Sequence, residues 1–270
     1  MALIHIENVS VAYGSPSRPV LSNVDLTIEK GEFVCLLGQT GCGKSTLLRL
    51  ILGSEQPSAG RVLIDGVERH QPDRTCGFVP QKYSLFPDKT VLDNITFGPE
   101  VNEFNLLTSL SHRYFRRRRQ FRQEAMQYIR RLGLHDADAA KYPDQLSGGM
   151  QQRVAIAQAL INKPKILLLD EAFSALDPGT RKDMQRLIRE LWRGTGITVL
   201  FVTHNTQEAL YLSSRVIVLA KEAPDQGSRI ALELPVPELC PEVQISTLVM
   251  RLDFASGCTR EPDGAALATA

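Results

Sequence analysis

The chain has 270 residues, 43% of them hydrophobic, with 31 Lys and Arg against 30 Asp and Glu. This balance is typical of a globular protein of one large or two modest domains, and it excludes a disordered or fibrous chain. The formal net charge of +1 gives no overall reason to expect nucleic acid or an acidic partner. Apolar runs such as 166–169 and 197–202 fall far short of the roughly 20 residues that span a bilayer.

The N-terminus lacks the basic start and apolar block of a secretory signal, so we expect a cytoplasmic protein. The cysteines are odd in number and widely spaced, with no Cys-x-x-Cys pair and no metal-ligand spacing to histidine. A reducing compartment disfavours disulfides, which predicts free thiols. These thiols belong to Cys35, Cys42, Cys76, Cys240 and Cys258.

The first third of the chain consists of short runs with strand periodicity, separated by glycine-rich turns. The apolar run 33–37 ends in such a turn, and 44–52 follows with apolar residues at helical spacing, which predicts strand, loop and helix. Other strands are expected at 3–11, 24–28, 61–65 and 76–79.

Residues 90–162 are mostly compatible with helix and predict a helical insertion. One apolar helix face is formed by Phe121, Ala125, Tyr128, Ile129 and Leu132. The alternation then resumes, with strands at 166–170, 197–202 and 215–219 and helices at 179–193 and 207–212. Apolar strands alternating with amphipathic helices predict an α/β fold with a mainly parallel sheet covered on both faces. After residue 221, the prolines at 224, 235, 237 and 241 and a weak periodicity predict no definite element, and we expect the last dozen residues to be loose.

The strongest motif, 38–45, lies where a predicted strand gives way to a predicted helix. It matches the phosphate-loop pattern with Gly38, Gln39, Thr40, Gly41, Cys42, Gly43, Lys44 and Ser45. In such a loop backbone N–H groups turn toward the β-phosphate, Lys44 reaches the β- and γ-phosphates, and Ser45 can ligate Mg²⁺. Thr46 is placed to touch the α-phosphate. The strand-to-helix context disfavours the alternative, a chance glycine-rich turn.

A second motif places Asp170 and Glu171 at the carboxyl end of the predicted strand 166–170, where open α/β sheets bind ligands. Asp170 would hold Mg²⁺ directly or through water, and Glu171 would polarise the water that attacks the γ-phosphate. Taken alone, this pattern is more often a strand followed by a solvated turn. The phosphate loop upstream favours the catalytic interpretation.

A third motif, Ser147, Gly148 and Gly149, precedes an Ala- and Ile-rich helix over 154–160. Ser147 is typical of a helix N-cap, and the glycines would expose N–H groups at a helix N-terminus. By itself the motif also fits an ordinary capped helix. Two such helix N-termini in one chain suggest that the same nucleotide is bound from two sides.

Together these residues resemble the nucleotide-binding subunits of ATP-binding cassette (ABC) transporters, over about residues 3–220. Leu-Ser-Gly-Gly at 146–149 separates that family from other phosphate-loop ATPases, and further positions match at Tyr13, Gln81, 174–177 and His204. The resemblance implies a phosphate-loop NTPase fold with a mainly parallel core sheet, an antiparallel β subdomain and an inserted helical subdomain at about 90–162. It implies an ABC ATPase domain over 1–220 and a short, partly disordered tail over 221–270.

By this resemblance the chain is an ATPase that uses ATP and Mg²⁺. Tyr13 would stack on adenine, Gln81 would sense Mg²⁺ and the attacking water, Asp177 would cross a dimer interface, and His204 would contact the γ-phosphate. The metal ligands would be Ser45, Gln81 and Asp170. The catalytic residues would be Glu171, His204, Gln81 and Lys44. ATP would also contact Tyr13, Gly38, Gln39, Thr40, Gly41, Cys42, Gly43, Ser45, Thr46, Ser147, Gly148, Gly149 and Asp177. Taken singly, Tyr13, Gln81 and His204 also fit plain structural roles at the ends of strands and helices.

The resemblance also implies partners. Two ATPase chains, as a homodimer or a related pair, would pack head to tail with each ATP between one phosphate loop and the other chain's 147–149. Separate transmembrane permease subunits and, through the complex, a solute-binding receptor would join them at the cytoplasmic face of the inner membrane, where the chain would be peripheral. Nucleic acid is not expected as a partner, and no separate regulatory domain is expected after the cassette.

Met150 and the run 204–219 are similar to importer ATPases for nitrate, sulfonate, taurine and related small solutes. Asn205 departs from the Asp usual after the histidine, and importers for glycine betaine-like solutes share Met150. Two other functions stay open: a soluble ABC ATPase acting on nucleic acid or ribosomes, and an exporter subunit. The soluble relatives usually carry a long coiled coil or two cassettes in one chain, and this sequence has neither feature.

The segment 102–122 is longer than the family's usual connection and is rich in arginine, with no acidic residue between 113 and 122 to balance the charge. Its arginines are Arg113, Arg116, Arg117, Arg118, Arg119 and Arg122. A solvated helix face is one interpretation. Contact with a membrane subunit or anionic lipid headgroups is another. Nucleic-acid binding, with Tyr114 and Phe115 stacking on bases, is a third.

Overall fold

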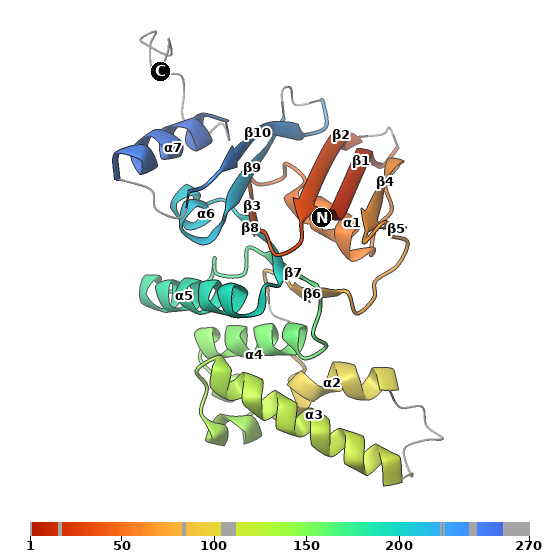
Figure 1. Ribbon diagram of the computed structural model, residues 1–270, viewed down its shortest axis with the longest axis vertical. Coiled ribbons are helices and arrows are strands. Elements are labelled where there is room, and N and C mark those ends of the chain that lie inside the picture. The colour runs from red at the N-terminus through yellow and green to blue at the C-terminus, as the bar shows by residue number, and fades with distance from the viewer. Residues whose placement is uncertain are drawn as a thin grey trace. The chain divides into compact units, whose positions relative to one another are not determined.

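The computed structural model describes residues 2–15, 18–82, 85–103, 112–221, 223, 225–237 and 242–255. Its contacts divide the chain into two compact units (Figure 1). The first consists of Met1–Gln71 and Leu200–Ala270, and the second of Pro72–Val199. No helix within the described ranges combines the length and apolarity needed to cross a bilayer.

The first unit contains an antiparallel sheet in the order β2-β1-β4-β5. Its strands are β1 (Ala2–Tyr13), β2 (Arg18–Glu29), β4 (Ala59–Ile64) and β5 (Val67–Glu68). Ile4 of β1 lies opposite Ile28 of β2 and Ile64 of β4. Val24, Leu26 and Ile28 are buried and alternate with exposed residues, because one face of the sheet packs on the core. This sheet is the antiparallel part that the resemblance implies.

The same unit contains a second set of strands in the order β10-β9-β3-β8. These include β3 (Phe33–Leu37), β8 (Thr198–Thr203) and β9 (Arg215–Ala220), with β8 beginning at the end of the second unit. β3 runs parallel to β9, with Cys35 opposite Val216, and every residue of β3 is buried. Helices α1 (Lys44–Leu52) and α6 (Thr206–Leu212) follow β3 and β8. Continuously apolar strands followed by helices are what a covered parallel sheet requires.

Two elements follow residue 221, where the sequence pattern predicts none. β10 (Arg229–Pro235) pairs antiparallel with β9, and α7 is Glu242–Ala255. Ile230, Leu232 and Leu234 alternate along β10, and only Leu234 is fully buried, as in an edge strand, where a terminal proline is tolerated. The last dozen residues, Cys240 and Cys258 lie outside the described residues, whereas the described cysteines Cys35, Cys42 and Cys76 are not in disulfide bonds. The division of the chain at residue 220 stays a prediction.

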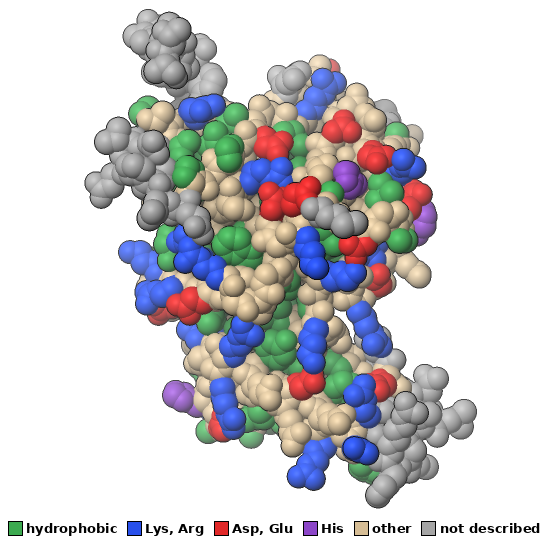
Figure 2. All heavy atoms as spheres, in the orientation of Figure 1, with side chains coloured by type: hydrophobic (Ala, Val, Ile, Leu, Met, Phe, Trp, Pro, Cys, Tyr) green, Lys and Arg blue, Asp and Glu red, His purple; other side chains and the backbone are tan. Residues whose placement is uncertain are grey.

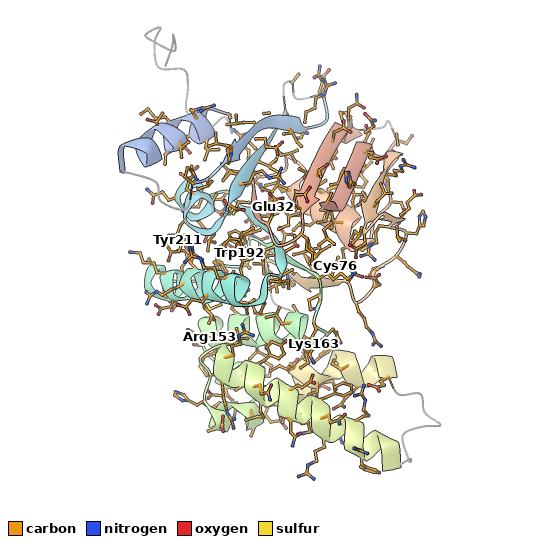
Figure 3. The ribbon with its side chains drawn as sticks, in the orientation of Figure 1. Glu32, Cys76, Arg153, Lys163, Trp192 and Tyr211 are labelled. Carbon is orange, nitrogen blue, oxygen red and sulfur yellow. The ribbon has the colours of Figure 1, made fainter. Side chains whose placement is uncertain are left out.

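The second unit joins two parallel strands to a group of helices. β6 (Cys76–Val79) pairs with β7 (Ile166–Asp170), with Phe78 opposite Leu168. The α-helices are α2 (Val91–Glu103), α3 (His112–Arg131), α4 (Gly148–Leu160) and α5 (Pro178–Thr195), and the 3₁₀ turns are Asp136–Ala140 and Pro143–Gln145. Ala125, Ile129 and Leu132 of α3 are buried, as the predicted apolar face requires. Arg153 of α4, labelled in Figure 3, donates a hydrogen bond of 2.5 Å to the Leu132 carbonyl.

The arginine-rich helix α3 is balanced by acidic residues of α2. Arg117 pairs with Glu103 at 2.7 Å, Arg118 with Glu100 at 3.3 Å and Arg122 with Asp93 at 3.0 Å. The expectation of an unbalanced run is therefore wrong for these arginines, because the compensating carboxylates lie on the neighbouring helix. Figure 2 shows basic side chains spread over this helical part with acidic ones between them. The Arg113 and Tyr114 side chains lie outside the described residues.

Candidate functional site

The phosphate loop connects β3 to α1 and surrounds a buried ammonium group. Lys44 Nζ donates to the carbonyl oxygens of Gly38 and Gln39, at 2.8 Å and 2.9 Å. The Cys42 N–H donates to the Gln39 carbonyl at 3.2 Å, which closes the loop. Lys44 is only 5% exposed, so its charge is already held inside the loop. A positive group enclosed by a loop at a helix N-terminus is suited to phosphate oxygens.

Glycine is needed at two positions of this loop. Gly43 is the N-cap of α1 with φ 95° and ψ 9°, a left-handed conformation that a side chain disfavours. No side chain caps α1, as suits a helix N-terminus that binds an anion. At Gly38 an added Cβ would lie 2.4 Å from the Leu219 carbonyl oxygen and 2.7 Å from Cys42 Sγ. The backbone at Gly38 therefore approaches β9 too closely for any side chain.

Tyr13, predicted to stack on adenine, ends β1 with 44% of its surface exposed. Its hydroxyl donates to Glu55, and Glu55 lies 3.8 Å from Arg49 Nε. Partial burial and then the Glu55 hydrogen bond raise the pKa of Tyr13. No sequence signal marks Glu55, since no motif places a carboxylate there. Its hydrogen bond restricts where the ring can lie.

In the second unit the structure brings Gln81 and Glu171 together. Gln81 Nε2 donates to Glu171 Oε2 at 3.0 Å, although the two residues are 90 positions apart. Asp170 is the last residue of β7, and Glu171 follows it with φ 46°. A non-glycine residue with positive φ carries backbone strain, which is common at functional sites. The residue predicted to be the base is therefore hydrogen-bonded to the residue predicted to sense the attacking water.

The segment after Glu171 is held by Arg181 of α5, which sequence reasoning missed. Its guanidinium donates to the carbonyl oxygens of Phe173 at 3.2 Å, Ser174 at 3.2 Å and Leu176 at 3.0 Å. The Ser174 N–H in turn donates to the Glu171 carbonyl at 3.0 Å. An arginine on a helix gives no sequence signal for such a role, because its partners are backbone atoms.

Two helix N-termini in the second unit carry the other predicted residues. Ser147 is the N-cap of α4, and its Oγ accepts the Met150 N–H at 3.3 Å, as the sequence predicts. Asp177 is the N-cap of α5, and its Oδ1 accepts the N–H groups of Gly179 at 3.1 Å and Thr180 at 3.0 Å. The hydrogen bonds from Thr180 lower the pKa of Asp177. Asp177 therefore has a structural role within this chain as well as the interface role that the resemblance implies.

His204 follows β8 and is exposed, and Asn205 caps α6 by accepting the Glu208 N–H at 3.0 Å. The phosphate loop, Thr46, Tyr13 and His204 belong to the first unit. The second unit holds the remaining predicted site residues, namely Gln81, Ser147, Gly148, Gly149, Asp170, Glu171 and Asp177. Each unit thus presents its own part of the predicted site.

The chemistry of these groups fits a magnesium nucleotide. Ammonium and N–H donors suit phosphate, and the predicted metal ligands Ser45, Gln81 and Asp170 offer oxygen atoms, which Mg²⁺ prefers. No group of three or more His, Cys, Asp or Glu able to hold a metal by itself occurs in the part of the chain that the structure describes. A magnesium ion bound through one or two carboxylates and substrate phosphates does not need such a group.

Comparison with known proteins places this geometry in a family. Residues 21–174 match the ABC transporter family model. The nitrate import ATP-binding protein of Synechococcus elongatus is 39% identical over 236 residues, which cover 86% of this chain and 81% of that protein. The sulfate/thiosulfate import ATP-binding protein of Rhizobium meliloti is 42% identical over 226 residues, 83% of this chain and 62% of its own length. The spermidine/putrescine import ATP-binding protein of Haemophilus ducreyi is 38% identical over 262 residues, which cover 93% of this chain and 67% of that protein.

The chain therefore spans about two thirds of the length of the sulfate and polyamine relatives. Two solved structures, described as a dimeric bacterial ABC transporter cassette and a dimeric post-hydrolysis cassette bound to ADP and Pi, match with a TM-score of 0.72. They are 33% and 32% identical, and the match covers 88% of this chain and 100% of theirs. The predicted phosphate-loop NTPase fold is confirmed. The chain belongs to the ABC transporter family and is an ATPase of its ATP-binding cassette type.

Proposed function

We propose that this chain is the ATP-hydrolysing subunit that energises import of a small solute by an ABC importer, with nitrate-like or sulfonate-like anions as the first candidates. The observation that carries the proposal is the match to a nitrate import ATP-binding protein along 86% of this chain and 81% of the relative. Sulfate/thiosulfate and spermidine/putrescine import proteins also match, which supports import as the direction of transport.

In this proposal the first unit binds the nucleotide. Tyr13 stacks on adenine with its hydroxyl held by Glu55. The N–H groups of the phosphate loop and Lys44 bind the phosphates, with Thr46 at the α-phosphate. Lys44 exchanges its present carbonyl partners in the loop for β- and γ-phosphate oxygens, which are stronger, charged acceptors.

The second unit supplies the base. Glu171 accepts a proton from the water that attacks the γ-phosphate, and Gln81, already hydrogen-bonded to Glu171, orients that water. His204 contributes a hydrogen bond to the γ-phosphate. Mg²⁺, bound with the nucleotide by Ser45, Asp170 and Gln81, would neutralise charge on the β- and γ-phosphates.

The two solved cassettes named above are described as dimeric, which supports a dimer here. We place two chains head to tail, so that Ser147, Gly148 and the N-terminus of α4 face the ATP held by the other chain's phosphate loop. The positive end of the helix dipole and its free N–H groups favour a phosphate at that position. The second chain is a copy of this one or a related ATPase, and Asp177 lies at the interface.

The dimer closes on ATP and reopens after hydrolysis, and these movements drive separate membrane-spanning permease subunits. A solute-binding receptor joins through the complex. The chain then acts as a peripheral protein at the cytoplasmic face of the inner membrane. The names of the import relatives support this assembly.

The test is affinity purification of the tagged Glu171→Gln variant from gently solubilised membranes with ATP present. The amide cannot take the proton from water, so the ATP-bound assembly should accumulate, and we expect a multi-span permease to co-purify. The matched control is Glu171→Gln combined with Lys44→Ala, which should hold ATP weakly and recover less permease. Recovery in the soluble fraction with DNA or ribosomes would contradict the importer assignment.

A further inference from the structure

The turn that carries His204, residues 203–206, is fixed by hydrogen bonds of buried side chains. Thr203 Oγ1 donates to Glu208 Oε2 at 2.5 Å and accepts the Asn205 N–H at 3.1 Å. Thr203 and Glu208 are 3% and 8% exposed. The residues on both sides of His204 are therefore held to α6, while His204 itself is exposed.

A further hydrogen bond reaches this turn from the C-terminal helix. Thr206 Oγ1, at the first position of α6, donates to Asp253 Oδ1 of α7 at 2.5 Å. α7 packs against α6, β9 and β10 (Figure 1), and Leu252, next to Asp253, is fully buried. A hydrogen bond to a carboxylate is shorter and stronger than one between neutral groups. The apolar anchor at Leu252 and the bond at Asp253 thus tie α7 to the beginning of α6.

We propose that Asp253 is a positioning residue, through which α7 holds the His204 turn in the orientation needed for ATP hydrolysis. The inference rests on the proposed function, in which His204 contacts the γ-phosphate. Thr206 is two residues from His204, so a shift at the start of α6 changes the direction of the histidine. A displacement of about 1 Å in a group that contacts the reacting atoms can lower a rate about 100-fold.

The proposal gives the C-terminal segment a function in the ATPase cycle. α7 lies 38 residues or more after His204 in the sequence, yet its carboxylate ends one residue from the cap of α6. Any event that moves α7 would loosen Thr206 and lower the rate without touching the phosphate loop. The residues that bind ATP in the first unit, Tyr13 and Lys44, have their own partners, which do not involve α7.

The experiment compares variants at both ends of this bond. Asp253→Ala removes the acceptor, whereas Asp253→Asn keeps an acceptor oxygen. Thr206→Val removes the donor, whereas Thr206→Ser keeps the hydroxyl. We expect Asp253→Ala and Thr206→Val to lower kcat about tenfold with KM for ATP within about twofold of wild type, because orientation rather than nucleotide binding is lost. Asp253→Asn and Thr206→Ser should recover most of kcat. Arg251→Ala, an exposed position on the same helix, is the matched control and should keep the wild-type rate.

A comparison of Asp253→Ala in two backgrounds distinguishes a positioning role in catalysis from a role in stability alone. If Asp253 acts through His204, Asp253→Ala should lower kcat in the wild-type background and have no further effect in the His204→Ala background. An equal fold-loss in both backgrounds, or a loss of melting temperature with unchanged kcat, overturns the proposal. Should Asp253→Ala not fold, the Thr206→Val and Thr206→Ser pair gives the same comparison.

Different results would reject the role of His204 in the proposed function and the role of α7. A His204→Ala variant as active as wild type removes His204 from the proposed function and the inference with it. A His204→Ala variant that loses activity, together with an Asp253→Ala variant that keeps wild-type kcat, leaves the proposed function standing and rejects the role of α7.

Discussion

Cys35 is a titratable side chain in the middle of β3, and its burial makes the stability of the protein depend on alkaline pH. The residue is fully buried beside Ser213 and Glu208. Burial raises the pKa of its thiol well above the ordinary value of 9.0, and the nearby Glu208 charge adds to this effect. Burial also raises the pKa of Cys42 in the phosphate loop. Both thiols therefore stay protonated in the folded chain under conditions that ionise them in the unfolded chain.

The stability of the protein should accordingly fall as the pH rises above about 9. Above that pH the unfolded chain has released the Cys35 proton and the folded chain retains it, so unfolding is favoured by about 1.4 kcal/mol per pH unit for this thiol. Below it both states hold the proton, and the stability that the thiol contributes is fully present. We expect Cys35→Ala to make the decline between pH 9 and pH 10.5 shallower by about that amount. Urea unfolding at several pH values measures the slope, and an unchanged slope would contradict the assignment.

The contact between α4 and α5 depends on the absence of a side chain at Gly149. A Cβ there would lie 2.5 Å from Thr180 Cγ2 in the first turn of α5. Thr180 is β-branched and its N–H is bound to Asp177, so its methyl group has little freedom to move. The second glycine of the predicted ATP-binding motif is thus required by helix packing as well as by any contact with phosphate.

Gly149→Ala should therefore destabilise the protein. Overpacking typically costs about 1–3 kcal/mol, and the higher helix propensity of alanine offsets about 1 kcal/mol of it. Adding Thr180→Ser should restore the free energy of unfolding, since serine lacks Cγ2 and keeps the hydroxyl. Urea unfolding of the two single variants and the double variant gives the comparison. A Gly149→Ala protein that Thr180→Ser does not improve would show that this contact is not the cause.

In the proposed function, the residues that act on one ATP come from two chains. The phosphate loop lies in one unit, and the base Glu171 with Ser147 lies in the other. In the proposed head-to-tail dimer each ATP uses Lys44 of one chain and Ser147–Gly149 of the other. In this proposal each chain contributes half of each of the two sites.

Mixing two inactive variants tests this arrangement. Lys44→Ala should remove phosphate binding, and Ser147→Arg should block the facing helix end, so each variant alone should be inactive. A mixed dimer carries one site with both defects and one intact site. If the sites act independently, an equal mixture should recover roughly a quarter of the wild-type ATPase rate, because half of random dimers are mixed. A mixture as inactive as its components would contradict the head-to-tail dimer.

Local sequence was sufficient for the elements and for the phosphate loop. The predicted strands at 33–37, 76–79 and 166–170 and the predicted helix at 44–52 coincide with β3, β6, β7 and α1. Apolar periodicity and glycine turns determine such elements because they act over a few neighbouring residues. The Ser147 cap was predictable for the same reason, since it needs only Met150 three residues on.

Tertiary structure alone decided which distant residues meet. Gln81 reaches Glu171, the acidic residues of α2 neutralise arginines of α3, and Asp253 binds Thr206, across separations of 14 to 90 residues. The edge strand β10 and helix α7 also escaped prediction, because their stability comes from packing on β9 and α6 rather than from strong periodicity of their own. By itself the sequence determined the family, the loop that binds phosphate and the order of elements, which depend on local spacing. The partners that hold the catalytic groups in place depend on how the chain folds back on itself, and no local pattern records them.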